Sequence, residues 1–386
     1  MTQKPIRLAI VHPTFNTLGG AENHIIWTAQ ALTDSGYDIT IIASGFSVKT
    51  KAIFKQMGCT LYNVWVPFVP PYDNLKRNLL IMGFRIRHLL HSFDVINVHN
   101  FPAIAWVGIA CRFDASAIAP IVWTCHEPPH FIYENETRHL AWLKDVDKRC
   151  VPLAKHIVTN SAFTQQHVKA IYNRDSLAEP FGVPIPKTLN TAPKPDHTGD
   201  ITIGMASRLE TMKNFKQVFK AIASIKQTHP NIFKRIHIKI AGTGSTEAAL
   251  KAYIHTLCIE RAIQFLGFVS DAALDQLYQD ALFMVFVPFE EPLGLIPIEA
   301  SLHQCPTIGS NSGGPAQTIQ HNVTGLLVDP HSVADIADAI VRFCKNPQEA
   351  LTMGHAAQTY ALAHYTNTHT AKRYQNLFES YLVSKC

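Results

Sequence analysis

The sequence predicts an α/β protein with two doubly wound domains, in which each parallel sheet is covered by helices. Three observations support this fold class. Strand-like apolar runs alternate with amphipathic helical stretches along the chain. A stretch rich in Pro, Thr and Asp at residues 181–200 interrupts this alternation, as an interdomain linker does. The length of 386 residues exceeds what one compact core usually holds. We therefore predict one domain over residues 1–185 and a second over residues 186–364.

The predicted strands are runs of β-branched and aliphatic residues at the spacing of βα units. In the first domain they cover residues 7–13, 38–44, 94–100, 120–125 and 156–161. In the second domain they cover residues 201–209, 236–244, 262–269, 283–289, 306–311 and 325–330. A helix is predicted from Ala21 to Ser35, followed by Gly36 as its C-cap. The mostly polar segment from Tyr365 to Val383 predicts a last helix, which by its pattern alone would pack on the second domain.

Composition excludes several classes of protein. The hydrophobic fraction of 47% is typical of a soluble globular chain, and no apolar run reaches the ~18 residues that a membrane-spanning helix needs. The N-terminus leads into a strand without the order of a signal peptide, and the eight cysteines form no C-x-x-C pair. We therefore expect a reduced, cytoplasmic protein. The formal charge of +5 argues against a nucleic-acid partner but permits anionic ligands or an anionic membrane surface.

The segment HEPPH, residues 126–130, matches the H-E-x-x-H signature of zinc peptidases. That signature needs a helix, on which both histidines share one face. Pro128 and Pro129 remove backbone donors and disfavour a helix here, and the preceding PIVWTC has the pattern of a buried strand. A zinc hydrolase is therefore kept only as an alternative. We place His126 at the C-terminal end of a strand, where ligands bind in open α/β sheets.

Two carboxylates flank a predicted strand–loop–helix junction in the second domain. In PFEEPLGLIPIEAS, Glu291 and Glu299 are separated by seven residues, Gly294 permits a tight turn and Pro297 suits a first helical turn. Backbone N–H groups at such a helix start favour phosphate and other polar oxygens. The carboxylates would accept hydrogen bonds from the hydroxyls of a sugar or ribose. The alternative is two surface glutamates that only stabilise the helix dipole.

Basic and glycine-containing loops follow other predicted strands of the second domain. Arg208 and Lys213, in SRLETMKN, leave the end of a strand and form a candidate diphosphate clamp, or else are solvated loop charges. Gly242 and Gly244 follow the next strand and indicate either close backbone approach at a nucleotide pocket or merely a tight turn. The G-x-G-x-x-G pattern of a dinucleotide site is incomplete because Glu247 occupies its third position.

Two further motifs lie in the first domain. Gly19 and Gly20 are in the loop before the first helix, where backbone amides could face an anion, although a plain flexible connection is the alternative. The D-x-D pattern from Asp145 to Asp147 matches a metal motif of other sugar-transferring folds. It stands in a charged helical stretch, so we interpret it as a solvated helix face and predict no metal site.

Together these segments resemble the family-4 glycosyltransferases, retaining enzymes of the GT-B fold, in which two Rossmann-like domains face each other across a cleft. GGAENH resembles the glycine-rich N-terminal loop, TCHE the strand with the active-site histidine, and SRLETMKN the G-R-L-x-x-x-K-N segment with Ser207 in place of glycine. EEPLGLIPIEA resembles the E-x7-E motif, which is the specific one. Pro292 stands where many members have glycine, and Gln317 replaces a common glutamate and has no assigned role.

The resemblance implies a role for each matching residue. The catalytic residues would be His126, Arg208, Lys213 and Glu291. The donor-binding residues would be Gly19, Gly20, Gly242, Gly244, Leu293, Gly294, Leu295 and Glu299. The two cations would neutralise the donor diphosphate in place of a metal, Glu291 would bind a hydroxyl of the donor sugar, Glu299 would bind the ribose, and His126 would face the sugar. Residues 365–386 would form a helix that crosses back to the first domain.

The implied activity is retaining, metal-independent transfer of a sugar from a nucleoside-diphosphate sugar to a glycan, a lipid-linked acceptor or a small molecule. GDP-mannose is the preferred donor, because EEPLGLIPIEA and HPTFNTLGGAEN resemble mannosyltransferase members. No cofactor is expected. The alternative from another class is a GT-B-like sugar-nucleotide epimerase, which would need acid/base residues for proton transfer at the sugar that the sequence does not offer.

Residues 64–90 mix aromatic and aliphatic residues with Lys76, Arg77, Arg85 and Arg87. Basic and apolar residues together on a helix favour contact with a membrane interface, which would place the protein at the cytoplasmic face of a membrane. The alternative is an ordinary sheet-covering helix with exposed arginines.

Overall fold

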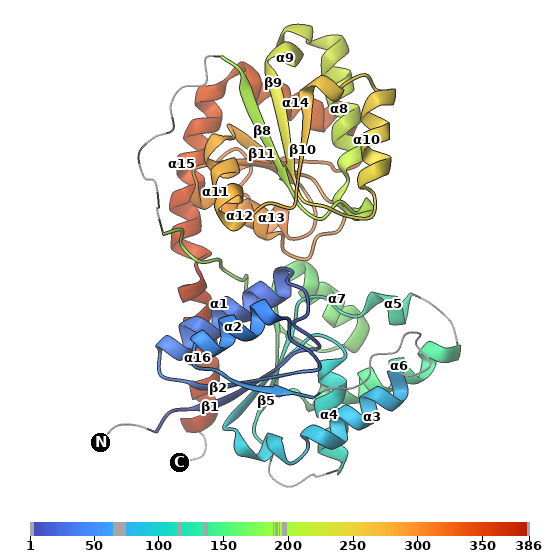
Figure 1. The fold of residues 1–386 in the computed structure, drawn as a ribbon, viewed down its shortest axis with the longest axis vertical. Helices are drawn as coiled ribbons and strands as arrows, with labels where there is room; N and C mark the ends of the chain where they lie inside the picture. The colour runs from blue at the N-terminus through green and yellow to red at the C-terminus, as the bar shows by residue number, and fades with distance from the viewer. Residues whose placement is uncertain are drawn as a thin grey trace. The chain divides into compact units, whose positions relative to one another are not determined.

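The computed structural model describes residues 4–64, 75–113, 118–134, 138–187, 189, 192, 194 and 199–383. The chain forms two compact units, shown in Figure 1. The first unit contains Met1–Phe181 and Asn367–Cys386, and the second contains Gly182–Thr366. The boundaries therefore fall at 181 and 366, where the sequence placed them at 185 and 364. Part of the predicted linker at residues 181–200 lies outside the described residues.

The first unit contains a seven-stranded parallel sheet in the order β3-β2-β1-β4-β5-β6-β7. Its strands are β1 Arg7–Val11, β2 Asp38–Ala43, β3 Thr60–Asn63, β4 Val95–His99, β5 Ile121–Cys125, β6 His156–Thr159 and β7 Leu177–Ala178. The five predicted strands are confirmed. The sequence missed β3 and β7, which lie at the two edges of the sheet, because edge strands are short and bury few apolar side chains.

Helices cover the first sheet. They are α1 Gly20–Asp34, α2 Val48–Gln56, α3 Leu75–Ile86, α4 Ala103–Phe113, α5 His130–Tyr133, α6 Arg138–Cys150, α7 Ala162–Tyr172 and α16 Asn367–Val383. As predicted, α1 ends before Gly36, which has a φ of +88°. Helix α16, the end of the chain, packs beside α1 in this unit (Figure 1). It buries Tyr374, Phe378 and Tyr381, and the Tyr374 hydroxyl lies 2.9 Å from Thr124 Oγ1 of β5.

The second unit contains a six-stranded parallel sheet in the order β10-β9-β8-β11-β12-β13. Its strands are β8 Ile201–Ala206, β9 Ile236–Ala241, β10 Ile263–Gly267, β11 Phe283–Phe286, β12 Thr307–Ser310 and β13 Gly325–Val328. Its helices are α8 Phe215–Thr228, α9 Pro230–Arg235, α10 Glu247–Thr256, α11 Asp271–Asp280, α12 Leu295–Leu302, α13 Pro315–Thr318, α14 Val333–Lys345 and α15 Pro347–His364. All six predicted strands are confirmed. Aliphatic and aromatic side chains of α8 and α14, such as Phe219, Ile340 and Phe343, fill the core on one face.

Both sheets therefore share one topology, in which the chain starts in the middle, moves to one edge and then returns to build the other half. The strand order reverses between β1 and β4 in the first unit and between β8 and β11 in the second. In sheets of this kind, ligands bind beyond the carboxyl ends of the strands at that reversal. Each unit thus offers one position for a site, defined by the loops that follow these central strands.

Candidate active site

In the first unit, the predicted site residues lie beyond the carboxyl ends of β1 and β5. His126 follows Cys125, the last residue of β5, as predicted. Its backbone N–H donates to Asn100 Oδ1 at 2.9 Å, and its carbonyl accepts from Asn160 Nδ2 at 3.0 Å. The loop ends after β4 and β6 therefore fix the backbone of His126 on both sides.

The HEPPH segment does not form the helix that a zinc peptidase needs. Pro129 is the N-cap of the four-residue helix α5, so His130 is helical whereas His126 lies beyond the end of β5. His126 points its Nε2 at His99, while His130 lies against His167, with ring centroids 4.9 Å apart. Among the described residues, no group of three or more His, Cys, Asp or Glu could hold a metal ion.

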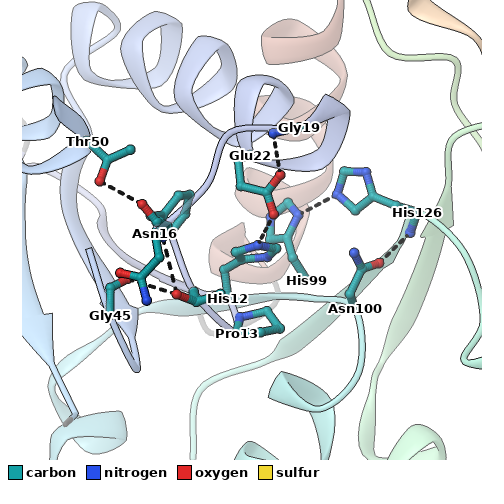
Figure 2. Close-up of polar contacts among 12 residues, drawn as sticks. His12, Pro13, Asn16, Gly19, Glu22, Gly45, Thr50, His99, Asn100 and His126 are labelled. Atoms are coloured by element: carbon teal, nitrogen blue, oxygen red, sulfur yellow. Dashed lines mark hydrogen bonds and ion pairs between the residues drawn. The ribbon is translucent and has the colours of Figure 1, made fainter. Parts of the chain in front are cut away.

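Four buried histidines, His12, His24, His99 and His126, form what we call the histidine cluster. Figure 2 shows His12, His99 and His126 of this cluster. His99 Nδ1 lies 3.0 Å from His126 Nε2, and the His24 ring stacks on Phe181 with centroids 3.5 Å apart. Burial lowers the pKa of His126 to about 3 and holds the pKa values of His24 and His99 well below the usual range, with a further lowering by neighbouring histidines. These three rings are therefore neutral at physiological pH.

The glycine loop before α1 is held by Glu22. Its Oε2 accepts from the Gly19 N–H at 2.8 Å, and its Oε1 lies 2.9 Å from His12 Nε2 (Figure 2). Burial would raise the pKa of the Glu22 carboxyl, but the hydrogen bonds from His12 and from backbone amides outweigh it, so this pKa lies below its ordinary value. The Gly19 amide is thus already engaged, whereas Gly20 is the exposed first residue of α1.

In the second unit, Arg208 and Lys213 lie in the loop that follows β8. Arg208 is exposed, and Lys213 ends the short 3-10 turn η4 Thr211–Lys213. Asn214 comes next, with a φ of +62°, and its Nδ2 donates to Val287 O and Pro330 O at 2.8 Å each. This buried amide fixes the turn that presents Lys213 against the end of β11.

Gly242 and Gly244 allow the loop after β9 to pack on the loop after β8. A Cβ on Gly242 would lie 1.9 Å from the Ser207 carbonyl oxygen, and one on Gly244 would lie 2.3 Å from that of Leu209. The two loops are joined by Leu209 N–H to Thr243 O at 2.9 Å and by Ser245 Oγ to a Glu210 carboxylate oxygen at 2.6 Å. Both glycines are therefore required for the close approach of these two protein loops. Their predicted contact with a nucleotide stays a prediction.

Glu291 and Lys213 are brought together as an ion pair, in which Lys213 Nζ contacts Glu291 Oε2. Each side chain is 17% exposed, so both remain open to a ligand. The loop 291–294 is shaped by glycines: Gly294 has a φ of +77°, and the Gly314 N–H donates to the Glu291 carbonyl oxygen at 2.7 Å. A Cβ on Gly314 would lie 2.2 Å from the backbone of Leu293.

The loop leads into α12, which starts at Leu295 and carries Glu299. The first amides of this helix have no acceptor within the helix, as at the start of any α-helix. The binding of phosphate or hydroxyl groups there stays a prediction. Glu299 Oε2 accepts from the Tyr278 hydroxyl at 2.7 Å. Burial raises the pKa of Glu299, although the Tyr278 hydrogen bond opposes this. Glu299 is therefore held in place from α11.

The interpretation of the D-x-D pattern as a solvated face is wrong for one of its residues. Asp145 is exposed and pairs with Arg149 Nε at 2.7 Å. Asp147 is fully buried, and its Oδ2 accepts from the hydroxyls of Tyr133 and Tyr172 at 2.6 Å each. Asp147 lies two residues after Asp145 on α6 and so points to the opposite side of the helix, into the core, where both tyrosine hydroxyls bond to its Oδ2.

Sequence reasoning missed Glu22, Asn97, His99 and Tyr278. The signals were polar residues inside or directly after apolar strands, as in VINVHN, and a glutamate three residues after a helix N-cap, as in GGAE. These signals become informative only when the strand order places β1, β4 and β5 side by side.

Comparisons with known proteins agree with this geometry. Residues 18–177 match the Glycosyltransferase Family 4 domain and residues 188–360 match the Glycosyl transferases group 1 domain. The D-inositol 3-phosphate glycosyltransferase of Pseudarthrobacter chlorophenolicus is 26% identical over 89% of this chain and 86% of its own. The Alpha-1,3/1,6-mannosyltransferase ALG2 of Mus musculus is 23% identical over 90% of each chain.

Solved structures share the fold. The HepE protein of Anabaena, crystallised with UDP and glucose, superposes with a TM-score of 0.77 at 19% identity, covering 97% of this chain and 100% of its own. The sucrose-phosphate synthase of Thermosynechococcus elongatus superposes with a TM-score of 0.78 at 16% identity, covering 98% and 100%. The two domain matches together cover most of the chain, which therefore belongs to the family-4 glycosyltransferases, is built on the GT-B fold and uses sugar-nucleotide donors.

Proposed function

We propose that this glycosyltransferase transfers its sugar with retention of anomeric configuration and without a metal, and that GDP-mannose is its donor. The observation that carries the proposal is the contact of Lys213 with Glu291 beside the start of α12. A cation, a carboxylate and free helix amides at one position suit a sugar diphosphate, which offers both anionic oxygens and hydroxyls.

Each group of the second unit would then bind one part of the donor. Lys213 and Arg208 would neutralise the charge that develops on the departing nucleotide, which is the role of the divalent cation in metal-dependent enzymes. Glu291 would accept a hydrogen bond from a sugar hydroxyl once Lys213 turns to the phosphate. Glu299, oriented by Tyr278, would accept from the ribose hydroxyls.

Two considerations support the retaining outcome and the mannosyl donor. The retaining outcome rests on the E-x7-E resemblance, because that motif is typical of retaining enzymes. The mannosyl donor is supported by the similarity of this chain to ALG2, which is named as a mannosyltransferase. A glycan, a lipid-linked sugar or a small molecule would accept the sugar.

A donor panel tests this proposal. Purified protein is incubated with UDP-, GDP- and ADP-sugars in the presence of EDTA, with candidate acceptors added, and nucleotide release is measured. We expect acceptor-dependent release that is fastest with GDP-mannose and is unchanged by EDTA. Loss of activity in EDTA would contradict the metal-independent transfer, and recovery of an epimerised donor without transfer would favour the epimerase.

We also propose that the first unit contacts an anionic membrane surface through α3. The sequence placed this contact in residues 64–90, of which residues 65–74 lie outside the described residues. On α3, Lys76, Arg77 and Arg85 are exposed, and the Phe84 ring, 49% exposed, packs edge-on against Phe113, 52% exposed, with centroids 5.6 Å apart. Exposed aromatic rings beside basic residues favour an anionic interface. No helix among the described residues is long and apolar enough to cross a membrane.

Liposome flotation tests the membrane contact. We expect binding to vesicles that contain anionic lipid, weakening as salt is raised, and little binding to neutral vesicles. The double substitution Phe84→Ser and Phe113→Ser should reduce binding. Val48→Ser is the control, because Val48 is a large apolar residue on α2 that is 88% exposed. Equal flotation of the double variant and the wild type would overturn this role for α3.

A further inference from the structure

A chain of hydrogen bonds links Asn97 in β4 to His126 beyond β5. Asn97 Nδ2 lies 3.3 Å from the Val122 carbonyl oxygen and 2.9 Å from Thr124 Oγ1. Asn97 Oδ1 lies 2.8 Å from His99 Nε2. His99 Nδ1 in turn lies 3.0 Å from His126 Nε2 (Figure 2).

The Val122 carbonyl stands at one end of this series of hydrogen bonds and sets the direction of each of them. The Val122 carbonyl can only accept, so the group of Asn97 that faces it is the amide nitrogen. The amide oxygen of Asn97 then faces His99 and can only accept, so His99 Nε2 carries a proton. A neutral His99 has its lone pair on Nδ1, and this lone pair requires a proton on His126 Nε2.

Both rings are kept neutral by their surroundings. His99 is 2% exposed and His126 is 8% exposed. Burial lowers the pKa of both groups, and the other histidines of the cluster lower it further. The titratable groups nearest these rings are His12 and His24, and the Glu22 carboxylate bonds to His12.

A neutral His126 with its proton on Nε2 has a lone pair on Nδ1. No described residue bonds to this Nδ1, and in Figure 2 the second ring nitrogen of His126 points away from His99. The cluster therefore presents a hydrogen-bond acceptor beyond the end of β5, where ligands of such sheets bind.

We propose that Asn97 and His99 are positioning residues that lock His126 in its Nε2–H tautomer, so that Nδ1 accepts a hydrogen bond from a hydroxyl of the donor sugar. This inference rests on the proposed function for the identity of the ligand. It assigns His126 the role of an orienting acceptor and denies it that of an acid at Nδ1. The role of such a supporting residue is to fix which ring nitrogen is protonated, as is familiar from metal-bound and catalytic histidines.

The first test is a spectrum of the free protein. Two-bond 15N–1H correlations of the histidine rings distinguish the two neutral tautomers, and the His126 signals are those missing from the His126→Gln spectrum. We expect wild-type His126 to be neutral and protonated on Nε2 at pH 7. Protonation of Nδ1, or a charged ring, would overturn the inference.

The second test uses substitutions. Asn97→Leu removes the amide and His99→Leu removes the acceptor of His126 Nε2. Either change should let the Nδ1–H tautomer of His126 appear in the spectrum and should lower kcat by about tenfold or more with little change in KM. His24→Leu is the matched control, because His24 is equally buried and contacts the His126 ring with centroids 5.3 Å apart but makes no hydrogen bond to it. An unchanged tautomer in Asn97→Leu, or an equal loss of kcat in His24→Leu, would contradict the positioning role.

Failure of this inference is distinguishable from failure of the proposed function. The spectrum needs neither donor nor acceptor, so an Nε2–H tautomer with no sugar transfer would refute only the function. Transfer by a protein whose His126 carries its proton on Nδ1 would refute only the tautomer lock.

Discussion

The two units place polar groups at the same topological position by opposite means. In the first unit, the side chains beyond β1, β4 and β5 are buried and, for His24, His99 and His126, neutral, and they hold one another through directed hydrogen bonds. In the second unit, the groups beyond β8 and β11 are an ion pair and an exposed arginine, which glycine loops and the Asn214 amide hold in place. The charged side chains of the second unit can turn toward a ligand. The side chains of the first unit are already fixed by their hydrogen bonds to one another, so a ligand must match their positions.

The largest effect is expected from the ion pair of the second unit. Lys213→Ala and Glu291→Ala should each reduce transfer by about a hundredfold or more, because each removes an electrostatic or hydrogen-bonding group from the reacting donor. Steady-state transfer rates measure this effect, and circular dichroism checks the fold. Lys251→Ala is the control, since Lys251 forms an ordinary helical pair with Glu247 at 2.7 Å. Full activity of either site variant would contradict the assigned roles.

The next effect concerns the packing of the two loops in the second unit. Gly244→Ala places a methyl group against the Leu209 carbonyl, so the loop with Arg208 and Lys213 must move. We expect the KM for the donor to rise about tenfold and the thermal midpoint to fall, since backbone clashes of this kind cost a few kcal/mol. Gly199→Ala meets no atom within 4 Å and should behave as wild type. Identical KM values in the two variants would show that this close approach does not position the cations.

A third prediction uses the neutral histidines to separate the units by pH. Because their pKa values are lowered on folding, the unfolded chain binds protons that the folded first unit does not, so its stability falls as pH drops below about 6.5. Each such histidine contributes up to about 1.4 kcal/mol per pH unit. Hydrogen exchange of β4 and β5 against β8 and β9, measured from pH 7 to 4, should show earlier loss of protection in the first unit.

His24→Leu sharpens that comparison. The variant lacks one titrating group, so the free energy of unfolding of the first unit should depend less steeply on pH below about 6.5. An identical pH dependence in the variant would mean that His24 is not held neutral by burial. The exchange rates of β8 and β9 serve as the internal control, because His24 lies in the other unit.

The smallest effect is expected at the glycine loop. Glu22→Gln removes the charge that both His12 and the Gly19 N–H contact, while keeping one acceptor oxygen. We expect a rise in the donor KM of a few fold with the fold intact. Asp34→Asn at the other end of α1 is the control, because Asp34 is exposed and accepts a hydrogen bond from the Gln30 side chain at 2.8 Å. A Glu22→Gln variant with the KM of the wild type would show that the loop conformation does not depend on this carboxylate.

The sequence predicted the fold class and the central strands because long apolar runs at βα spacing leave few alternatives. It missed the edge strands β3 and β7, whose side chains are largely exposed and therefore show no such run. For the candidate site, the sequence identified residues in charged motifs such as SRLETMKN and EEPLGLIPIEA. The structure brings Lys213 and Glu291 of these motifs into contact.

The hydrogen bonds that join Asn97, His99 and His126 could not be predicted from the sequence, for a physical reason. Asn97, His99 and His126 come from neighbouring strands in space, and their relation depends on the register that pairs His99 of β4 with Thr124 of β5. Asp147 shows the same limit, since only packing reveals that Tyr133 and Tyr172 bury it. Charge patterns can thus be recognised along a chain, whereas hydrogen-bond direction requires a structure.

The anomeric configuration of the product tests the central claim most directly. Wild-type protein is given GDP-mannose, whose mannosyl bond is α, with an accepted acceptor and excess EDTA, and the new glycosidic bond is analysed by NMR. We predict an α bond formed at the rate seen without EDTA. A β bond, or formation of product only when a divalent metal is supplied, would contradict a retaining transfer in which Lys213 and Arg208 replace the metal.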